Sequence, residues 1–430
     1  MAWPVRYHMI GLLFAGSVVN YVDRVNISVA APVMMKELGW TKDEFGWVFS
    51  SFLIGYALLQ IPGGVIADRW SGRKVLALAF CGFSLFTFLT PWGANAFLLL
   101  LAVRFFVGVF ESMSFPAIVS INSRWIPRPE FGRAHTFSIS GINAGQMVAY
   151  PLTTWIILHY DWQKVFYVNA VFGLVWAAVW WWYAHDTPAS HPRVSPAERA
   201  YIESQIPPRS AHALPLQVVF TNLPLLTVAF GYMCYAYVGW MFLFWIPTYL
   251  VEARGYPLGV MGVLGIPLQG SAFIGLVGGG ILGDRLLRRG WSSQFVRARM
   301  GGIGLALSIP FLLAAALVSS STLCVACLIL FYGLFHTALS CYSTVAIEFN
   351  QHLAGAIFGL INTLGTFAGF LGPITAGYML TGSGGNWLIP FFVAAAVATA
   401  SACILLTVPV RPIRVEGVTP AVVPVGGMVR

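Results

Sequence analysis

The sequence predicts an all-α integral membrane protein with twelve transmembrane helices in two six-helix bundles. Three observations support this prediction: the composition, the recurrence of long apolar stretches, and a motif that occurs twice. Of the 430 residues, 58% are hydrophobic and only 9% are charged, whereas about a quarter of the residues in a soluble domain are charged. The chain therefore has the composition of a protein that lies within a lipid bilayer.

Twelve stretches of the chain are long and apolar enough to cross a membrane, which takes about 20 predominantly apolar residues. They lie at residues 9–35, 45–67, 75–91, 96–123, 134–159, 162–182, 222–251, 260–283, 300–318, 323–349, 355–380 and 387–408. Apolar and polar residues do not alternate along these stretches as they would in a membrane β-barrel, so the spans are predicted to be helical.

The longest polar segment separates the sixth stretch from the seventh. It divides the chain into an N-terminal bundle at 1–185, a cytoplasmic linker at 186–221, a C-terminal bundle at 222–410 and a cytoplasmic tail at 411–430. The second and eighth stretches end alike, in GGVIADRWSGRK and GGGILGDRLLRRG. A repeated six-helix unit is typical of alternating-access transporters. We therefore assign to a cytoplasmic gate five charged residues of the two copies, Asp68, Arg69, Arg73, Asp284 and Arg285.

The net charge of +9 reflects membrane topology rather than binding to nucleic acid. If the N-terminus is cytoplasmic, the cytoplasmic loops and tails hold 18 of the 24 Lys and Arg residues and the outer loops hold 4. This asymmetry follows the positive-inside rule. It predicts a multi-pass protein of the cell inner (plasma) membrane with both termini in the cytoplasm.

Two charged pairs interrupt otherwise apolar stretches, Asp23 with Arg24 and Arg104 with Glu111. A charge at the centre of a bilayer costs at least ~2.5–3.5 kcal/mol on insertion scales, so such residues are usually functional. Arg104 and Glu111 share one helix face and lie about 10 Å apart along the axis. The alternative to a functional role is a buried ion pair that only fixes helix packing. We assign Arg24 and Arg104 to the substrate and Asp23 and Glu111 to proton coupling. Arg24 is expected to contribute more to substrate affinity than Arg104, because Arg104 can be partly engaged by pairing with Glu111.

Uncharged polar residues complete the predicted substrate site. Tyr21 lies on the same helical stripe as Arg24, and Tyr56 and Gln60 share a face four residues apart. Gln146 and Asn362 are the corresponding candidates in the fifth and eleventh stretches. Each of these side chains could bind substrate hydroxyls or could instead form hydrogen bonds between helices.

These motifs resemble the major facilitator superfamily and, more closely, its anion:cation symporter family. The resemblance rests on NYVDR at 20–24, QIPGG at 60–64, Arg104 with Gly108 and Glu111, FPA at 115–117, WIPTYL at 245–250, and Asn362 with Gly369 and Pro373. It implies the major facilitator fold and kinship with bacterial sugar-acid/proton symporters, vesicular glutamate transporters and sialin. It also implies that an acid and an arginine at the positions of Asp23 and Arg24 act in proton coupling and substrate binding.

The predicted function is proton-coupled uptake of an organic anion, a sugar acid or related carboxylate, by a monomeric secondary transporter. The alternatives are an exchanger or exporter of the same fold, or a membrane sensor of the same ligand that does not transport it. The sequence contains no phosphate-cradling loop, hydrolytic centre or metal-ligand cluster that we recognise, so no enzyme activity and no cofactor are predicted. The expected partners are the anion, protons and the lipid bilayer.

Overall fold

The computed structural model describes residues 3–205, 221–349 and 354–410, which are almost entirely helical. Seven helices make the six crossings of the N-terminal half: α1 (Val5–Leu38), α2 (Lys42–Arg69), α3 (Gly72–Gly93), α4 (Phe97–Glu111) continued by α5 (Ser114–Trp125), α6 (Arg128–His159) and α7 (Trp162–Tyr183). The predicted fourth span is thus interrupted at Ser112 and Met113. Residues 206–220 of the predicted linker and the predicted tail at 411–430 lie outside the described residues.

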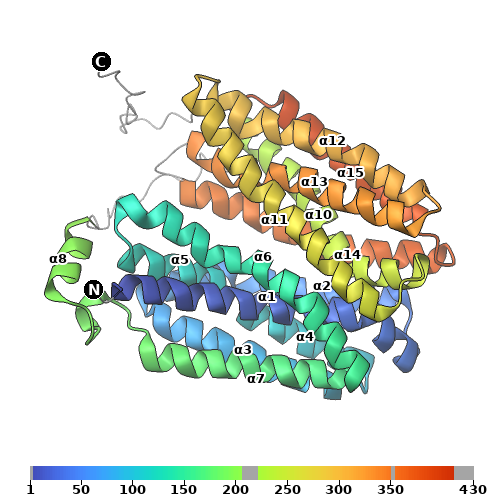
Figure 1. Cartoon of the computed structure of the whole chain (residues 1–430), viewed down its shortest axis with the longest axis horizontal. Helices are drawn as coiled ribbons and strands as arrows, with labels where there is room; N and C mark the ends of the chain where they lie inside the picture. The colour runs from blue at the N-terminus through green and yellow to red at the C-terminus, as the bar shows by residue number, and fades with distance from the viewer. Residues whose placement is uncertain (1–2, 206–220, 350–353, 411–430) are drawn as a thin grey trace.

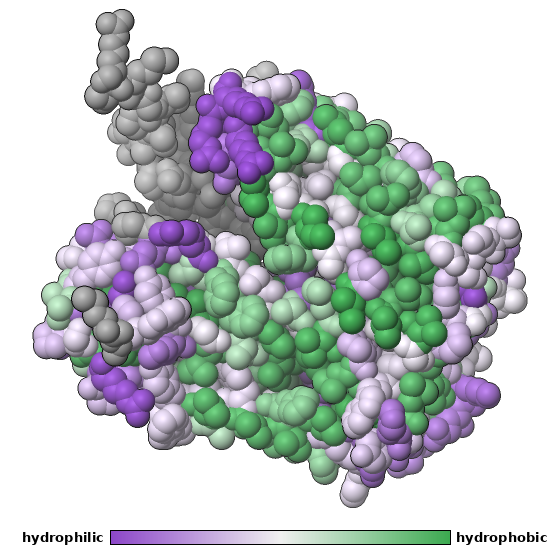
Figure 2. Space-filling view, in the orientation of Figure 1, coloured by the Kyte–Doolittle hydropathy of each residue, from purple (hydrophilic) through white to green (hydrophobic). Residues whose placement is uncertain are grey.

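The C-terminal half also crosses six times. Its helices are α10 (Leu223–Thr248) continued by η2 (Tyr249–Ala253), α11 (Leu258–Arg288), η3 (Phe295–Arg299) continued by α12 (Met300–Leu317), α13 (Ser321–Phe349), α14 (Ala354–Gly382) and α15 (Leu388–Thr407). Eight of the twelve segments are apolar enough to cross a membrane by length and hydropathy alone. Apolar residues cover the middle of the surface in Figure 2, and polar residues gather toward the two ends. The prediction of a twelve-helix membrane protein is confirmed.

Local sequence signals set several helix ends. The Thr41 side chain accepts a hydrogen bond from the backbone of Glu44, whose carboxylate in turn accepts one from the backbone of Thr41. This capping box satisfies amide groups that the first turn of α2 leaves without helical partners. At the end of α1, Gly39 adopts a left-handed conformation with φ 69°, which glycine accepts without steric cost.

Close packing of α2 on α4 positions the charged residues of α4. A Cβ atom on Gly108 would lie 2.0 Å from the backbone oxygen of Phe52, and one on Gly55 would lie 2.0 Å from that of Phe105. Only glycine permits this approach of two backbones, which is a common basis of helix association in membranes. The two glycines therefore hold Arg104 and Glu111 against the interior of the N-terminal half.

The two halves lie side by side (Figure 1) and are joined by polar contacts at the end of the molecule opposite the start of α1 and the end of α15. There Lys42 forms an ion pair with Glu252 at 2.8 Å, and Thr381 donates a hydrogen bond to Asp43 at 2.8 Å. We call this the closed end. The other end, where α1 begins and α15 finishes, is called the linker end.

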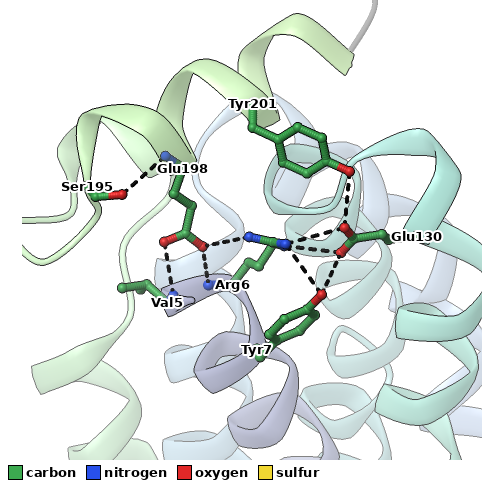
Figure 3. Close-up of polar contacts among 7 residues, drawn as sticks. All are labelled: Val5, Arg6, Tyr7, Glu130, Ser195, Glu198 and Tyr201. Carbon is green, nitrogen blue, oxygen red and sulfur yellow. Dashed lines mark hydrogen bonds and ion pairs between the residues drawn. The ribbon is translucent and has the colours of Figure 1, made fainter. Parts of the chain in front are cut away.

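At the linker end, the short helix α8 (Pro196–Gln205) is bound to the N-terminal half through Glu198 (Figure 3). The Glu198 carboxylate accepts hydrogen bonds from the backbone amides of Val5 and Arg6, both at 3.1 Å. It therefore caps α1, since a carboxylate is stabilising at the positive end of a helix dipole. The Arg6 side chain bridges Glu198 and Glu130, with Nε 3.1 Å from a Glu130 oxygen.

Replacing Glu130 with glutamine is expected to destabilise the protein by about 1–2 kcal/mol at neutral pH. Partial burial raises the pKa of Glu130, but hydrogen bonding and attraction from Arg6 outweigh it, and the pKa is lowered overall. A lowered pKa in the folded state means that this stabilisation is present at neutral pH and is lost as the pH falls toward that pKa. Thermal unfolding in detergent should therefore separate wild type from Glu130→Gln at neutral pH but not in acid.

The control for this prediction is Glu203→Gln. Glu203 pairs with Arg199 on the same helix, and both side chains are about half exposed. Such a surface pair contributes little to stability, so this variant should melt like the wild type. Equal melting temperatures for Glu130→Gln and Glu203→Gln at neutral pH would contradict a stabilising role for Glu130.

Candidate functional site

The four charged residues singled out from the sequence lie in the interior of the N-terminal half. Asp23 and Arg24 come from α1, and Arg104 and Glu111 come from α4. Each is no more than 1% exposed. Their formal charges cancel, which lowers the cost of placing all four in an apolar interior.

Glu111 is paired with Arg24 rather than with Arg104. The Nε of Arg24 donates to Oε1 of Glu111 at 2.7 Å, its Nη2 also contacts that oxygen, and its Nη1 donates to the Tyr21 hydroxyl at 3.1 Å. This pairing differs from the expectation that Glu111 partly occupies Arg104. Arg24 reaches Glu111 from α1, whereas Arg104 stands two turns, about 10 Å, from Glu111 along α4 and forms no ion pair with it among the described residues.

Aromatic rings surround the Arg24 guanidinium. Its central carbon lies 4.5 Å from the ring centre of Tyr21, 4.7 Å from that of Tyr56 and 5.6 Å from that of Trp240. Such contacts stabilise a desolvated cation by about 2 kcal/mol. The predicted residues Tyr21 and Tyr56 are thus brought to Arg24. Trp240 was not predicted, because it comes from α10 in the other half and no sequence pattern links it to α1.

Arg104 is buried without a hydrogen-bonding partner. Its Nε, Nη1 and Nη2 atoms have none among the described residues, although Asp23 attracts it electrostatically. The Phe52 ring lies 5.3 Å from the guanidinium carbons of both Arg104 and Arg24, so one ring contacts the two cations. A buried charge without a hydrogen-bonded partner is costly, and a planar guanidinium suits a carboxylate. This arrangement can bind an anion.

Asp23 faces a different set of neighbours from Arg24, as expected from their positions around the helix. Thr87 of α3 donates to one carboxylate oxygen at 2.9 Å, and Nδ2 of Asn26 donates to the other at 3.3 Å. The sequence did not identify Thr87, because a single threonine in an apolar helix usually bonds to its own backbone. Within the part of the chain that the structure describes, the Asp23 carboxylate is therefore hydrogen-bonded but not paired directly with an arginine.

The other predicted substrate ligands are not bonded to the four charges. The Thr366 hydroxyl donates to Oε1 of Gln60 at 3.4 Å, which joins α14 to α2. Gln146 and Asn362 are half-buried. In the described part of the chain, no hydrogen bond or ion pair links Gln60, Gln146 or Asn362 to the four charged side chains.

The predicted gate residues lie at the linker end. Asp284 and Arg285 are exposed in the last turns of α11, and Arg69 is exposed at the end of α2. Arg73 donates to the backbone oxygen of Trp181, and its guanidinium lies 4.5 Å from the ring centre of that residue, so its contacts stay within the N-terminal half. Asp68 lies in the last turn of α2, and its side chain is outside the described part of the structure.

Comparison with known proteins agrees with this architecture. A family model described as the Major Facilitator Superfamily matches residues 13–373. The chain is 31% identical to a probable galactarate/D-glucarate transporter, GudP, of Bacillus subtilis (strain 168), over 95% of this chain and 93% of that protein. It is 32% identical to a probable chloroplastic anion transporter of Oryza sativa subsp. japonica, over 91% of this chain and 66% of that protein.

A solved structure shares the fold: a bacterial homolog of the human lysosomal transporter Spinster, in an inward-facing and unoccupied conformation. The TM-score is 0.72 at 18% identity, over 94% of this chain and 95% of that one. Together with the family match, this agrees with the resemblance found in the sequence. The chain belongs to the Major Facilitator Superfamily of membrane transporters, in which its relatives include anion transporters.

Proposed function

We propose that this transporter imports an organic anion, a sugar acid or related carboxylate, together with protons. The observation that carries the proposal is the buried Arg104 guanidinium, which has no hydrogen-bonding partner in the described ranges of the chain. A carboxylate would supply the missing negative charge in a two-point contact. Because Arg24 already pairs with Glu111, we assign the primary contact with the anion to Arg104.

Charge balance suggests how protons would be coupled to the anion. With Asp23 and Glu111 ionised, the four buried charges sum to zero. Protonation of either acid leaves one positive charge in excess, which favours entry of an anionic substrate. Protonation of Glu111 would also weaken its pairing with Arg24 and free that guanidinium for the substrate. Release of the protons would reverse both effects.

The basic residues suggest an orientation in the membrane. By the positive-inside rule, the linker end would face the cytoplasm of a cell with a bacterial-type inner membrane. The closed end, with its Lys42–Glu252 pair, would face outward. Substrate would then leave through the linker end, where the Asp284 and Arg285 side chains are exposed. Closure of that end and opening of the other would complete alternating access.

The substitutions Asp68→Asn and Asp284→Asn are expected to slow transport several-fold while leaving anion affinity nearly unchanged. The two acids lie at matching helix ends, away from the four buried charges. They would act in closing the linker end rather than in binding. Calorimetry in detergent measures the affinity, and initial uptake rates in liposomes measure the transport. A large loss of affinity with normal turnover would contradict a gating role.

The function itself can be tested in two steps. A thermal-stability screen of the purified protein against mono- and dicarboxylates first identifies an anion that binds. Uptake of this anion is then measured in liposomes with an inward proton gradient, with and without a protonophore. Accumulation that collapses with the protonophore supports symport. Anion exchange that does not depend on the proton gradient would indicate an exchanger. Binding of the anion without counterflow of the labelled anion would indicate a sensor.

A further inference from the structure

Three uncharged polar side chains of the N-terminal half are buried without hydrogen-bonding partners in the described part of the chain. Asn20 on α1, Ser84 on α3 and Asn169 on α7 are each no more than 2% exposed. None of their side-chain nitrogen or oxygen atoms has a hydrogen-bonding partner among the described residues. None of the three belongs to the predicted substrate, proton or gate residues. Their presence in the apolar interior therefore needs a separate explanation.

The packing of α1 on α7 places Asn169 at the depth of Asp23. The two helices are antiparallel, since His8 bonds to Tyr183 at one end and Glu37 to Trp162 at the other.

Between these contacts, a Cβ atom on Gly16 would lie 2.6 Å from the Trp176 ring. Asp23 follows Gly16 by two helical turns, and Asn169 precedes Trp176 by two turns. In antiparallel helices these equal steps bring Asp23 and Asn169 to one level on facing surfaces.

The packing of α3 brings Ser84 to the same place. Thr87 bonds directly to Asp23, and Ser84 lies one turn before it on α3. A Cβ atom on Gly173 would lie only 2.0 Å from the Ser84 hydroxyl, and Asn169 is one turn from Gly173 on α7. Ser84, Thr87 and Asn169 therefore border one polar region around Asp23. Asn20 precedes Asp23 by one turn of α1 and belongs to the same region.

The chemistry of these groups favours water as their ligand. A buried polar atom without a hydrogen bond costs about 1–3 kcal/mol, and ordered water commonly satisfies such groups. A metal cation would bind the oxygens but would leave the amide nitrogens of Asn20 and Asn169 unsatisfied. The positive charge of Arg104, which acts on Asp23, would also repel a cation. Water both donates and accepts, and so satisfies every group.

We propose that Asn20, Ser84 and Asn169 hold ordered water molecules that are hydrogen-bonded to Asp23, and that this hydrated cluster controls the protonation of Asp23. The proposal rests on the proposed proton coupling and adds three positioning residues to it. The charged groups that act on Asp23 are Arg104 and Glu111 from α4 and Arg24 from α1. The side chains from α3 and α7 that enter the cluster are uncharged, so they would act through water rather than through charge.

The test measures the protonation of Asp23 directly. Infrared difference titration of the purified protein in lipid, with Asp23→Asn as the reference, reports its carboxyl group without requiring transport. Asn169→Leu removes the polar atoms while keeping the branching and the number of side-chain heavy atoms, and it should move the pH midpoint upward by about one unit, a tenfold change in proton affinity. Ser84→Ala should move it less, in the same direction. Asn169→Ser, which restores a hydroxyl and leaves room for water, should recover part of the shift.

Ser308→Ala is the matched control. Ser308 is also fully buried in a membrane helix, but its hydroxyl bonds to the Leu305 backbone oxygen at 2.7 Å. It lies in the other half and should leave the midpoint unchanged. If Asn169→Leu does not fold, the titration midpoint of Ser84→Ala still tests the proposal. Midpoints equal to wild type in both variants would overturn the proposal, as would a sodium-dependent midpoint in the wild type, which would indicate a cation in the cluster.

Transport assays distinguish this inference from the proposed function. Suppose that the Asp23 titration midpoint of the variants shifts as expected although uptake by the wild type does not depend on a proton gradient. In that case the proposal of proton-coupled transport is wrong and the proposal of a hydrated cluster is supported. If uptake follows the gradient but neither variant changes the midpoint, the cluster does not control Asp23 and the proposed function stands.

Discussion

Replacing Arg104 with glutamine is expected to weaken binding of the transported anion about 100-fold, which corresponds to about 2.7 kcal/mol. The buried guanidinium has no hydrogen-bonding partner among the described residues, so a bound carboxylate would make its principal polar contacts. Glutamine removes both the charge and the two-point geometry. Lysine keeps the charge but loses that geometry, so Arg104→Lys should bind with intermediate affinity.

Arg24→Gln should behave differently from Arg104→Gln. Arg24 is bonded to Glu111, and its removal leaves a buried carboxylate without its cation, which costs about 3–5 kcal/mol in stability. We therefore expect a larger loss of thermal stability than for Arg104→Gln. The sequence alone favoured Arg24 as the stronger anion ligand. Because Arg24 is bonded to Glu111, we propose the opposite order.

Calorimetric titration of each purified variant with the anion measures these effects, and size-exclusion chromatography confirms that the variants are folded. Arg289→Gln is the control, because Arg289 is exposed at the end of α11 and should bind like the wild type. Native affinity in both Arg104→Gln and Arg24→Gln would remove the basis for assigning these arginines to an anion.

The second large effect is expected from the buried acids. Asp23→Asn and Glu111→Gln should abolish accumulation driven by a proton gradient, because neither amide can release a proton. Asp23→Asn should retain exchange of labelled for unlabelled anion. Its amide oxygen can still accept the hydrogen bond from Thr87, and its neutral side chain imitates the protonated acid. Glu111→Gln should lose more stability, since it leaves the Arg24 charge uncompensated.

Both activities can be measured in the same liposomes, with uptake under a proton gradient compared with counterflow in its absence. Glu203→Gln, on the exposed surface of α8, serves as the control for loss of a carboxylate elsewhere. Normal accumulation in both Asp23→Asn and Glu111→Gln would show that neither acid couples protons to transport.

The sequence by itself determined the membrane class, the twelve spans and the four charges that lie inside those spans. These features are local: a run of apolar residues must be helical in lipid because its backbone groups can bond only within the helix. A charge inside such a run is costly wherever the helix packs. The duplicated motif likewise predicted two six-helix halves without any knowledge of their contacts.

Only the tertiary structure decided which charges pair. Whether Glu111 meets Arg24 depends on how α4 is placed relative to α1. Backbone contacts at two glycines, Gly55 on α2 and Gly108 on α4, fix the packing of α4 on α2. The same is true of Trp240 beside Arg24 and of Thr87 beside Asp23, because the members of each pair are far apart in sequence. Side-chain pairing inside a bundle is set by helix rotation and depth, and no pattern within a single helix encodes its depth relative to another.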